Sequence, residues 1–461
     1  MPINSFIYPG AKVPPAWEIT NSCRFNDGDS PYLSRTMETA TNRKKCTISV
    51  WLKKCSLASN QVFFGGGDSN ARYGFIDFDS NNQLFIQSAT SDSTDWAITT
   101  SAKYRDPSAW MHVVATLDST ESTNTDRVKL YVNGKLIPVA DYSSASYPSL
   151  NYDFQWTYGT DTQLVGKYPW NNFYWDGYMA EFHYIDGTAY AASQFGEYDD
   201  DSPTIWKPKQ VTGLTYGNQG FYLDFSDSSD LGADSSGNSN DFTENNIAAA
   251  DQATDTPTNN FCTISPIDGG VGTYTFSEGN CQIQGTSTSW YTRGSTFAVT
   301  KGKWYWECEF DAGTMIEIMV GIHDTSVDRT ATNLWVTGST LFYNDNGGEV
   351  RVDGTETTAD YGTLTAGDIM GFALNMDDKQ ITIYDNGSAI ISNLSIGSNI
   401  TEAMPTFLTD ATNIVFKANF GGCPAFSISS GNSDANGYGN FEYAVPSGYY
   451  ALCSKNLAEF G

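Results

Sequence analysis

The chain has 461 residues, with 25 Lys and Arg against 53 Asp and Glu, which gives a formal net charge of -28 at pH 7. This negative balance argues against nucleic acid or an anionic membrane as a main partner. The length suits two domains of about 200 residues each. Aromatic residues reach 14% while charged residues are scarce at 17%. Together with abundant Gly, Ser, Thr, Asn and Asp, this mixture is typical of short strands joined by polar turns.

No run of about 20 apolar residues is present, so we expect no transmembrane helix and no membrane insertion. The first ten residues lack a basic segment followed by an apolar one, so we expect no secretory signal. Helical periodicity is scarce, whereas alternation of apolar and polar residues recurs throughout the chain. The sequence therefore predicts an all-β protein made of two antiparallel β-sandwiches in tandem.

The first predicted domain spans residues 1–205 and contains a hairpin signal at 128–139. Asn133-Gly134 separates two alternating runs there, and Asn-Gly is the strongest short-range signal for a two-residue hairpin turn. Further strands of this domain are predicted over residues 46–52, 73–78, 83–87, 110–116, 163–166 and 177–187.

The composition changes between residues 206 and 260, where Asp, Ser, Asn, Pro and Gly dominate. Such a stretch indicates a linker. Residues 220–225 (Gly-Phe-Tyr-Leu-Asp-Phe) read as a short strand inside it. We therefore expect an ordered arm between the two domains.

The second predicted domain spans residues 261–461 and repeats the hairpin signal at 380–391, where Asn386-Gly387 forms the turn. Its other strands are predicted over residues 274–276, 302–310, 317–323, 341–343, 369–377 and 414–421. Along 304–310 every second residue, from Trp304 to Phe310, is apolar, so this side of the strand packs in a core. The opposite side, which carries Glu307, is expected to meet solvent or a ligand.

Eight cysteines are spread along the chain without a C-x-x-C motif, and only three histidines accompany them. A zinc site is therefore disfavoured. We expect reduced, buried thiols that behave as small apolar side chains. The cysteines are Cys23, Cys46, Cys55, Cys262, Cys281, Cys308, Cys423 and Cys453.

Several of these segments carry a family resemblance. Residues 110–116 (Trp-Met-His-Val-Val-Ala-Thr), 130–134 (Leu-Tyr-Val-Asn-Gly) and 177–187 resemble the closing strands of laminin-G-like, concanavalin A-type lectin domains. Residues 303–310 (Lys-Trp-Tyr-Trp-Glu-Cys-Glu-Phe), 367–374 and 381–387 resemble a SPRY domain, another concanavalin-like sandwich. The resemblance implies that both domains are concanavalin A-like jelly-roll sandwiches.

The order of the two domains, with the segments 223–242 and 255–261 between them, resembles structural proteins of tailed bacteriophages. This resemblance implies a non-enzymatic protein on the virion surface, assembled in the host cytoplasm, either as a capsid decoration or as a tail fibre or adhesion module. It implies that the modules bind host surface glycans or neighbouring virion proteins, and it requires no cofactor. By analogy with proteins that surround symmetry axes, we expect a homo-oligomer and favour a trimer.

The loop 168–178 concentrates six aromatic residues in eleven and is the first candidate ligand site. Aromatic rings pack against sugar rings in partly solvated contacts, and neighbouring amides and carboxylates form hydrogen bonds with the sugar hydroxyl groups. The alternative is that these rings are buried against the linker arm or a neighbouring subunit. In the second domain, Trp335 and Tyr343 are looser candidates. The predicted loop ligands are Trp170, Asn171, Asn172, Tyr174, Trp175 and Asp176.

Laminin-G-like domains often hold Ca²⁺ between loops, so the resemblance also implies a candidate calcium site. Calcium binds six to eight hard oxygen ligands, which clustered carboxylates and carbonyls supply. Asp residues in turns more commonly only cap the chain. The candidate ligands are Asp224, Asp227, Asp230 and Asp234, with Asp27-Gly-Asp29 as a further source of carboxylates.

Glu307 and Glu309 support an alternative function as a laminarinase-like glycoside hydrolase. Laminarinases share the sandwich class and carry catalytic carboxylates at alternate positions of one strand. Carboxyl groups about 6–7 Å apart on one strand face lie near the separation that a retaining mechanism needs. However, the order Glu-x-Glu-x-Asp at 307–311 differs from that family's pattern, and the strand is also explained as a SPRY strand with its polar side outward.

Overall fold

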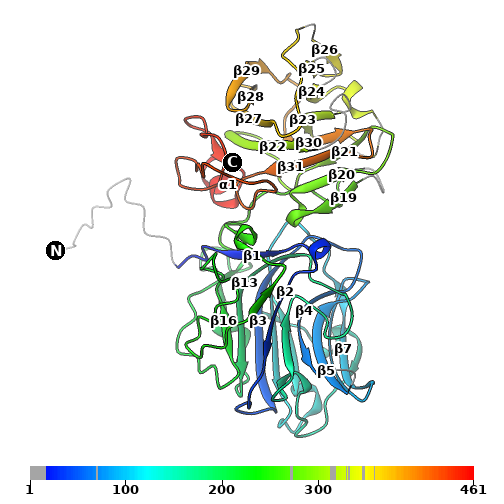
Figure 1. Ribbon diagram of the computed structural model, residues 1–461, viewed down its shortest axis with the longest axis vertical. Helices are drawn as coiled ribbons and strands as arrows, with labels where there is room; N and C mark the ends of the chain where they lie inside the picture. The colour runs from blue at the N-terminus through cyan, green and yellow to red at the C-terminus, as the bar shows by residue number, and fades with distance from the viewer. Residues whose placement is uncertain are drawn as a thin grey trace, which may run out of the picture.

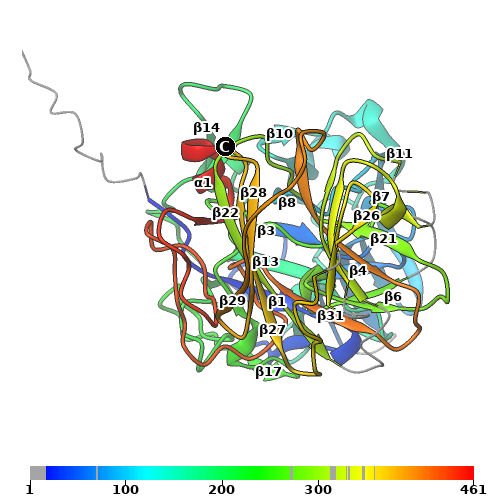
Figure 2. The same cartoon turned by 90° about the horizontal axis from the view of Figure 1, so that it is seen from above.

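The computed structural model describes residues 17–461 except 69–70, 270–273, 312–317, 329, 331–332, 345–347 and 358. The first ten residues, on which the expectation of no secretory signal depends, lie outside the described residues. Two β-sandwiches are stacked along the longest axis of the molecule (Figure 1). Seen from above, the second sandwich covers one end of the first (Figure 2). Among the described residues no helix is long and apolar enough to cross a membrane.

The first sandwich is made of two eight-stranded sheets. One sheet runs β10 (Lys135–Leu136), β9 (Val128–Val132), β8 (Met111–Asp118), β3 (Lys45–Lys54), β13 (Gly177–Asp186), β1 (Ser22–Phe25) and β18 (Gln252–Ala253), with β16 (Phe221–Leu223) also paired to β13. The other runs β11 (Tyr142–Ser146), β7 (Ser93–Lys103), β6 (Gln83–Thr90), β5 (Arg72–Phe78), β4 (Gln61–Gly67), β12 (Thr162–Val165), β2 (Tyr32–Thr36) and β17 (Thr243–Asn245). Their facing sides bury one continuous apolar core that includes Trp96, Trp156 and Trp175.

The second sandwich also has two sheets. One runs β19 (Tyr274–Ser277), β20 (Gln282–Gly285), β31 (Val415–Asn419), β22 (Lys303–Asp311), β27 (Ile369–Asn375), β28 (Gln380–Asp385) and β29 (Ser388–Ser395), with β32 (Tyr450–Ala451) parallel to β22. The other runs β21 (Tyr291–Gly294), β30 (Ala403–Thr409), β23 (Ile318–Asp324), β24 (Thr340–Asn344), β25 (Glu349–Val352) and β26 (Thr355–Glu356). The chain ends in the short helix α1 (Ser454–Phe460). The predicted all-β class and the two sandwiches are confirmed.

Both predicted hairpin turns are present. Asn133 and Gly134 have φ values of 48° and 73° between β9 and β10, and Asn386 and Gly387 have 46° and 76° between β28 and β29. Positive φ at both central residues is what a type I′ turn requires, and Asn and Gly tolerate it best. Gly134 is required for two reasons. Its φ is positive, and an added Cβ would lie 2.2 Å from the Trp206 ring.

The segment 206–260, predicted as a linker arm, is built into the first sandwich. Its strands β16, β17 and β18 pair with β13, β2 and β1, and β15 (Trp206–Pro208) pairs with β14 (Gly196–Tyr198). Phe221 and Leu223 are fully buried and Phe242 is nearly so. The strand predicted at 220–225 is present as β16, and the polar composition belongs to turns between it and other strands of two or three residues, which are too short to show a period-two pattern.

A buried polar network joins the two sandwiches. The Lys53 Nζ donates to Asp255 Oδ2 at 2.6 Å, Asn260 Oδ1 at 2.7 Å and the Phe261 carbonyl at 2.9 Å. Asp255 also accepts from the Trp110 indole at 2.8 Å. The side chains of Lys53 and Asp255 are 0% and 1% exposed, so the ion pair is shielded from water. All three ammonium protons have acceptors, which is what a buried charge requires.

All eight cysteines are buried and free, as expected. Cys55 and Cys423 pack with Tyr178 and Ala253 at the junction of the sandwiches. Burial raises the pKa of Cys46 to about 12 and that of Cys423 to about 11. The reactive thiolate is therefore scarce at neutral pH.

We expect the native thiols to react slowly with a disulfide reagent such as 5,5′-dithiobis-(2-nitrobenzoate) at pH 8. Burial blocks access, and the raised pKa values keep the thiols protonated. The absorbance change should correspond to fewer than one thiol per chain in native protein and to eight after unfolding in guanidinium chloride. Rapid modification of several thiols in the folded protein would contradict this burial.

Candidate ligand-binding sites

The aromatic loop between β12 and β13 folds back on the outer side of its own sheet. Lys167 and Tyr174 form an isolated β-bridge, and the Tyr168 N–H donates to the Phe173 carbonyl at 2.9 Å. Pro169 lies over Gly65 of β4, where an added Cβ would be 3.1 Å from the proline ring. The absence of a side chain at Gly65 therefore lets the loop lie close to the sheet.

Beside this loop is a groove of about 520 Å³, here called the Lys167 groove. Lys167 Nζ lies 4.2 Å from the ring centre of Tyr32 and 5.6 Å from that of Tyr174. Both distances are within cation–π range. The lining is contributed by Tyr32, Ser34, Gly67, Asp68, Thr160, Asp161, Thr162, Leu164, Lys167, Pro169 and Trp170.

Of the two cations at the Lys167 groove, Arg72 forms ion pairs, whereas Lys167 forms none with the residues that the structure describes. Arg72 binds Asp68 at 2.7 Å and Asp161 at 2.8 Å, and the hydrogen bond to Asp161 raises the pKa of the guanidinium. In contrast, no carboxylate of the described residues lies within ion-pair distance of Lys167. The groove thus combines an ammonium group, partly exposed aromatic rings and several hydroxyls, which suits an oxygen-rich ligand.

The structure divides the predicted loop residues among three environments. Trp170 lines the Lys167 groove, and Tyr174 lies beside Tyr32 with ring centres 6.4 Å apart. Asn171 and Asn172 are exposed at the tip of the loop. None of these four residues is buried in the core, so all remain available to a ligand.

Trp175 and Asp176 require a correction. Trp175 is fully buried and packs against Phe63 and Phe78 at ring distances of 6.0 and 6.2 Å, so it cannot form a stacking platform for a sugar. Asp176 is buried on the other side of the loop, in a cleft between the sandwiches. Both residues directly precede β13, which begins at Gly177, and successive side chains of an extended backbone point to opposite sides, so Trp175 enters the core and Asp176 lines the cleft.

The two candidate ligand residues of the second domain, Tyr343 and Trp335, differ in exposure. Tyr343 is buried in the core, and its hydroxyl donates to the Gly362 carbonyl, so it is unavailable to a ligand. Trp335 is partly exposed on the outer side of the second sheet, packs against Trp290 at 6.2 Å and lies 4.5 Å below the Arg351 guanidinium. Trp335 therefore remains an accessible aromatic surface.

The four calcium candidates do not converge. Asp224 and Asp227 accept hydrogen bonds from backbone N–H groups two residues further on, as turn-capping carboxylates do. Asp234 accepts from the backbone of Tyr222, Ser236 and Asn240, and Asp230 is exposed. In the part of the chain that the structure describes, no three His, Cys, Asp or Glu side chains are grouped to hold a metal ion.

The strand carboxylates are engaged in structural contacts. Glu307 is fully buried and accepts from the backbone of Glu442 and Tyr443, both at 2.9 Å, and from Tyr305 and Asn419. The outer side of β22, expected to meet solvent or a ligand, is therefore covered by the C-terminal segment. Burial raises the pKa of Glu307, although these hydrogen bonds oppose the shift. Glu309 is paired with Lys417 at 3.0 Å.

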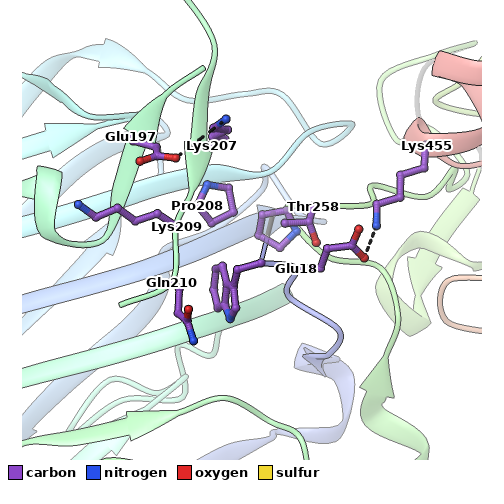
Figure 3. Close-up of a pocket in the computed structure, with 10 residues that line it drawn as sticks. Glu18, Glu197, Lys207, Pro208, Lys209, Gln210, Thr258 and Lys455 are labelled. Carbon is purple, nitrogen blue, oxygen red and sulfur yellow. Dashed lines mark ion pairs between the residues drawn. The ribbon is translucent and has the colours of Figure 1, made fainter. Parts of the chain in front are cut away.

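A further pocket of about 320 Å³ lies at the edge of the junction (Figure 3). Lys207 and Lys209 from the first domain line it together with Glu18 and Lys455, and Lys455 pairs with Glu18 at 2.5 Å. Sequence reasoning missed this pocket because four segments far apart in the chain contribute to it. All its described cations except Lys209 are ion-paired, and Lys209 donates to the Ser193 carbonyl.

Comparison with known proteins supports the two-domain description. Residues 27–193 match the model of the concanavalin A-like lectin/glucanases superfamily named Laminin_G_3, and residues 303–422 match the SPRY domain. No curated protein matches the chain.

Solved structures show similarity to single domains. The SPRY domain of human HERC1 is 17% identical, with 35% of this chain and 92% of that chain covered and a TM-score of 0.27. The TRIM65 PSpry domain is 12% identical over 34% and 90%, with a TM-score of 0.28. A heptameric SAP-like pentraxin from Limulus polyphemus is 15% identical over 37% and 78%, with a TM-score of 0.27. By its family matches and its fold, the chain combines a concanavalin A-like domain of the laminin G type with a SPRY domain.

Proposed function

We propose that this protein is a non-enzymatic binding module whose Lys167 groove holds an acidic glycan. The observation that carries this proposal is Lys167, which lies over the Tyr32 and Tyr174 rings and has no carboxylate partner among the described residues. A carboxylate or sulfate substituent would pair with this ammonium group, and Trp170 offers an apolar face for a sugar ring. Hydroxyls of Ser34 and Thr162 complete the polar lining.

Replacing Trp170 with Ala is expected to weaken binding of an acidic oligosaccharide about tenfold or more, because truncating a central aromatic contact removes about 2 kcal/mol. Uronate-containing, sulfated and neutral oligosaccharides would be compared by glycan array and calorimetry. Lys167→Met should reduce the preference for acidic over neutral glycans. The matched control is Phe173→Ala, which removes a ring from the same loop outside the groove. Equal binding by the Trp170 variant, or no glycan binding at all, would contradict the proposal.

The same array run with and without EDTA tests for calcium. In our proposal Lys167, rather than a metal ion, receives the anionic group, so we expect glycan binding that is insensitive to EDTA.

We place this module on the surface of a tailed-bacteriophage virion, as a capsid decoration or a tail adhesion module, and expect a homotrimer there. The support is the order of the two domains and the segment between them. Electron microscopy of virions labelled with an antibody against this protein checks the location, and light scattering checks the oligomeric state. Host glycans and neighbouring virion proteins are the partners in this proposal.

Hydrolysis of β-glucans through Glu307 and Glu309 is the competing function. The enclosure of Glu307 by Glu442 and Tyr443 argues against it, because a general acid or nucleophile must reach its substrate. Turnover of a β-glucan that is lost in Glu307→Gln and in Glu309→Gln would contradict the non-enzymatic proposal.

A further inference from the structure

A second cleft, of about 540 Å³, lies between the two sandwiches and is separate from the Lys167 groove. It is named here the junction cleft. The first sandwich contributes two carboxylates, Asp27 and Asp176, and the second contributes mainly apolar side chains, of which Ile267 is 62% exposed. The lining consists of Asp27, Cys55, Ser56, Leu57, Ala58, Asp176, Pro266, Ile267, Thr275 and Phe276.

Asp176 is the unusual member of this lining. It is only 6% exposed, yet its Oδ1 has no hydrogen-bond partner among the described residues. Its backbone is held in place, since its N–H donates to Gln61 Oε1 at 2.8 Å and its carbonyl accepts from Cys55 at 3.0 Å. A buried carboxylate oxygen without a partner is costly in a folded protein, so it points to a group that the cleft receives.

Nearby cations of the chain do not neutralise this cleft. Arg24 is committed to Asp251 at 3.0 Å and Glu278 at 2.7 Å, and Lys53 is committed to Asp255. Neither Asp27 nor Asp176 has an ion-pair partner among the described residues. Burial raises the pKa of Asp176, and the negative charges of Asp27 and Glu278 raise it further, while a hydrogen bond from the Asp27 backbone opposes the shift.

We propose that the junction cleft binds the arginine side chain of a partner protein. Two carboxylates can receive the planar guanidinium, and the walls formed by Leu57, Ile267 and Phe276 suit its aliphatic stem. Calcium fits this lining less well, because it needs six to eight oxygen ligands and the cleft walls are largely apolar. The site lies across both sandwiches, so it exists only when they are docked as described.

The test compares N-acetyl-arginine methylamide with its neutral isostere, N-acetyl-citrulline methylamide, by saturation-transfer difference NMR on the full chain. Arginine should bind about tenfold or more tightly than citrulline, because a charge-assisted hydrogen bond is lost in the isostere. Asp176→Asn should remove this preference. The control is Asp227→Asn, which makes the same side-chain substitution at an exposed turn carboxylate of the first sandwich. A peptide with a central arginine should bind at least as well as the free amino-acid derivative.

Two further measurements separate binding from folding. Asp176→Asn replaces a buried carboxyl group whose Oδ1 has no partner among the described residues, so its thermal unfolding temperature should not fall below that of the wild type. Guanidinium binding should release protons from Asp176 and weaken as the pH is lowered, and calorimetry in buffers of different ionisation enthalpy detects this release. The other titratable groups around Asp176, whose protonation also affects this pH dependence, are Asp27, Glu278 and the Cys55 thiol.

Equal binding of arginine and citrulline, or an unchanged preference in Asp176→Asn, would overturn the proposal. Displacement of the arginine derivative by millimolar Ca²⁺, reversed by EDTA, would instead assign the cleft to a metal ion and would also overturn it. Failure of glycan binding at Lys167 has no bearing on either result, because the two sites share no lining residue.

Discussion

Replacing Lys53 with Met is expected to lower the free energy of unfolding by about 3–5 kcal/mol, the range for removing one partner of a buried ion pair. The substitution leaves Asp255 charged in a site where it is 1% exposed, and it deprives Asn260 and the Phe261 carbonyl of their donor. Because this network joins the sandwiches, the variant should unfold at a lower denaturant concentration, and its two sandwiches should separate more readily than those of the wild type. Guanidinium chloride denaturation followed by tryptophan fluorescence measures the first, and small-angle X-ray scattering measures the second.

The control is Lys455→Met, which removes a partly exposed ion pair with Glu18 at the edge of the same junction. Exposed pairs contribute about 1 kcal/mol or less, so this variant should unfold nearly like the wild type. Combining Lys53→Met with Asp255→Asn should recover part of the loss, since no unpaired charge then remains buried. A Lys53 variant as stable as the Lys455 variant would contradict the proposed importance of the network.

Replacing Glu307 with Ala should destabilise the second sandwich by about 2–6 kcal/mol. The Glu307 carboxylate accepts hydrogen bonds from the backbone N–H groups of Glu442 and Tyr443. Each buried donor left without an acceptor costs about 1–3 kcal/mol. The C-terminal segment should detach from β22 before the sandwich unfolds. Limited proteolysis should therefore cut near residues 428–445 in the variant at protease concentrations that leave the wild type intact.

Glu309→Gln is the matched control for Glu307. It lies two positions along the same strand, and its partner Lys417 also binds Asp311 at 2.6 Å. Its loss should therefore cost about 1 kcal/mol or less. Equal protease resistance of the Glu307 variant and the wild type would show that the carboxylate does not hold the C-terminal segment.

Features that depend on neighbouring residues were predictable from the sequence. The Asn133-Gly134 and Asn386-Gly387 turns follow from local backbone preference, and the alternation from Trp304 to Phe310 follows from the strand period. Within residues 206–260, the strand predicted at 220–225 is confirmed as β16, but the other strands of two or three residues carry no such pattern. For this reason the segment as a whole looked like a linker, although Phe221 and Phe242 belong to the first core.

The aromatic loop illustrates the same limit within eleven residues. Its composition indicated a site, and Trp170 does line a groove, with Tyr174 beside Tyr32 of the same lining. Composition could not separate them from Trp175, because the direction of each ring depends on how the loop packs against Gly65 and where β13 begins. Asp176, predicted to bind the same ligand, lies instead in the junction cleft.

The all-β class, the two hairpin turns and the two sandwiches could be predicted from the sequence, because alternation and turn preference act between residues close in the chain. Which charged groups are buried, and what they contact, became known from the three-dimensional structure. Lys53 and Asp255 are 202 positions apart, and Glu307 meets the backbone of Glu442 across 135 positions. The burial of a charge depends on everything packed around it, and those neighbours come from distant parts of the chain.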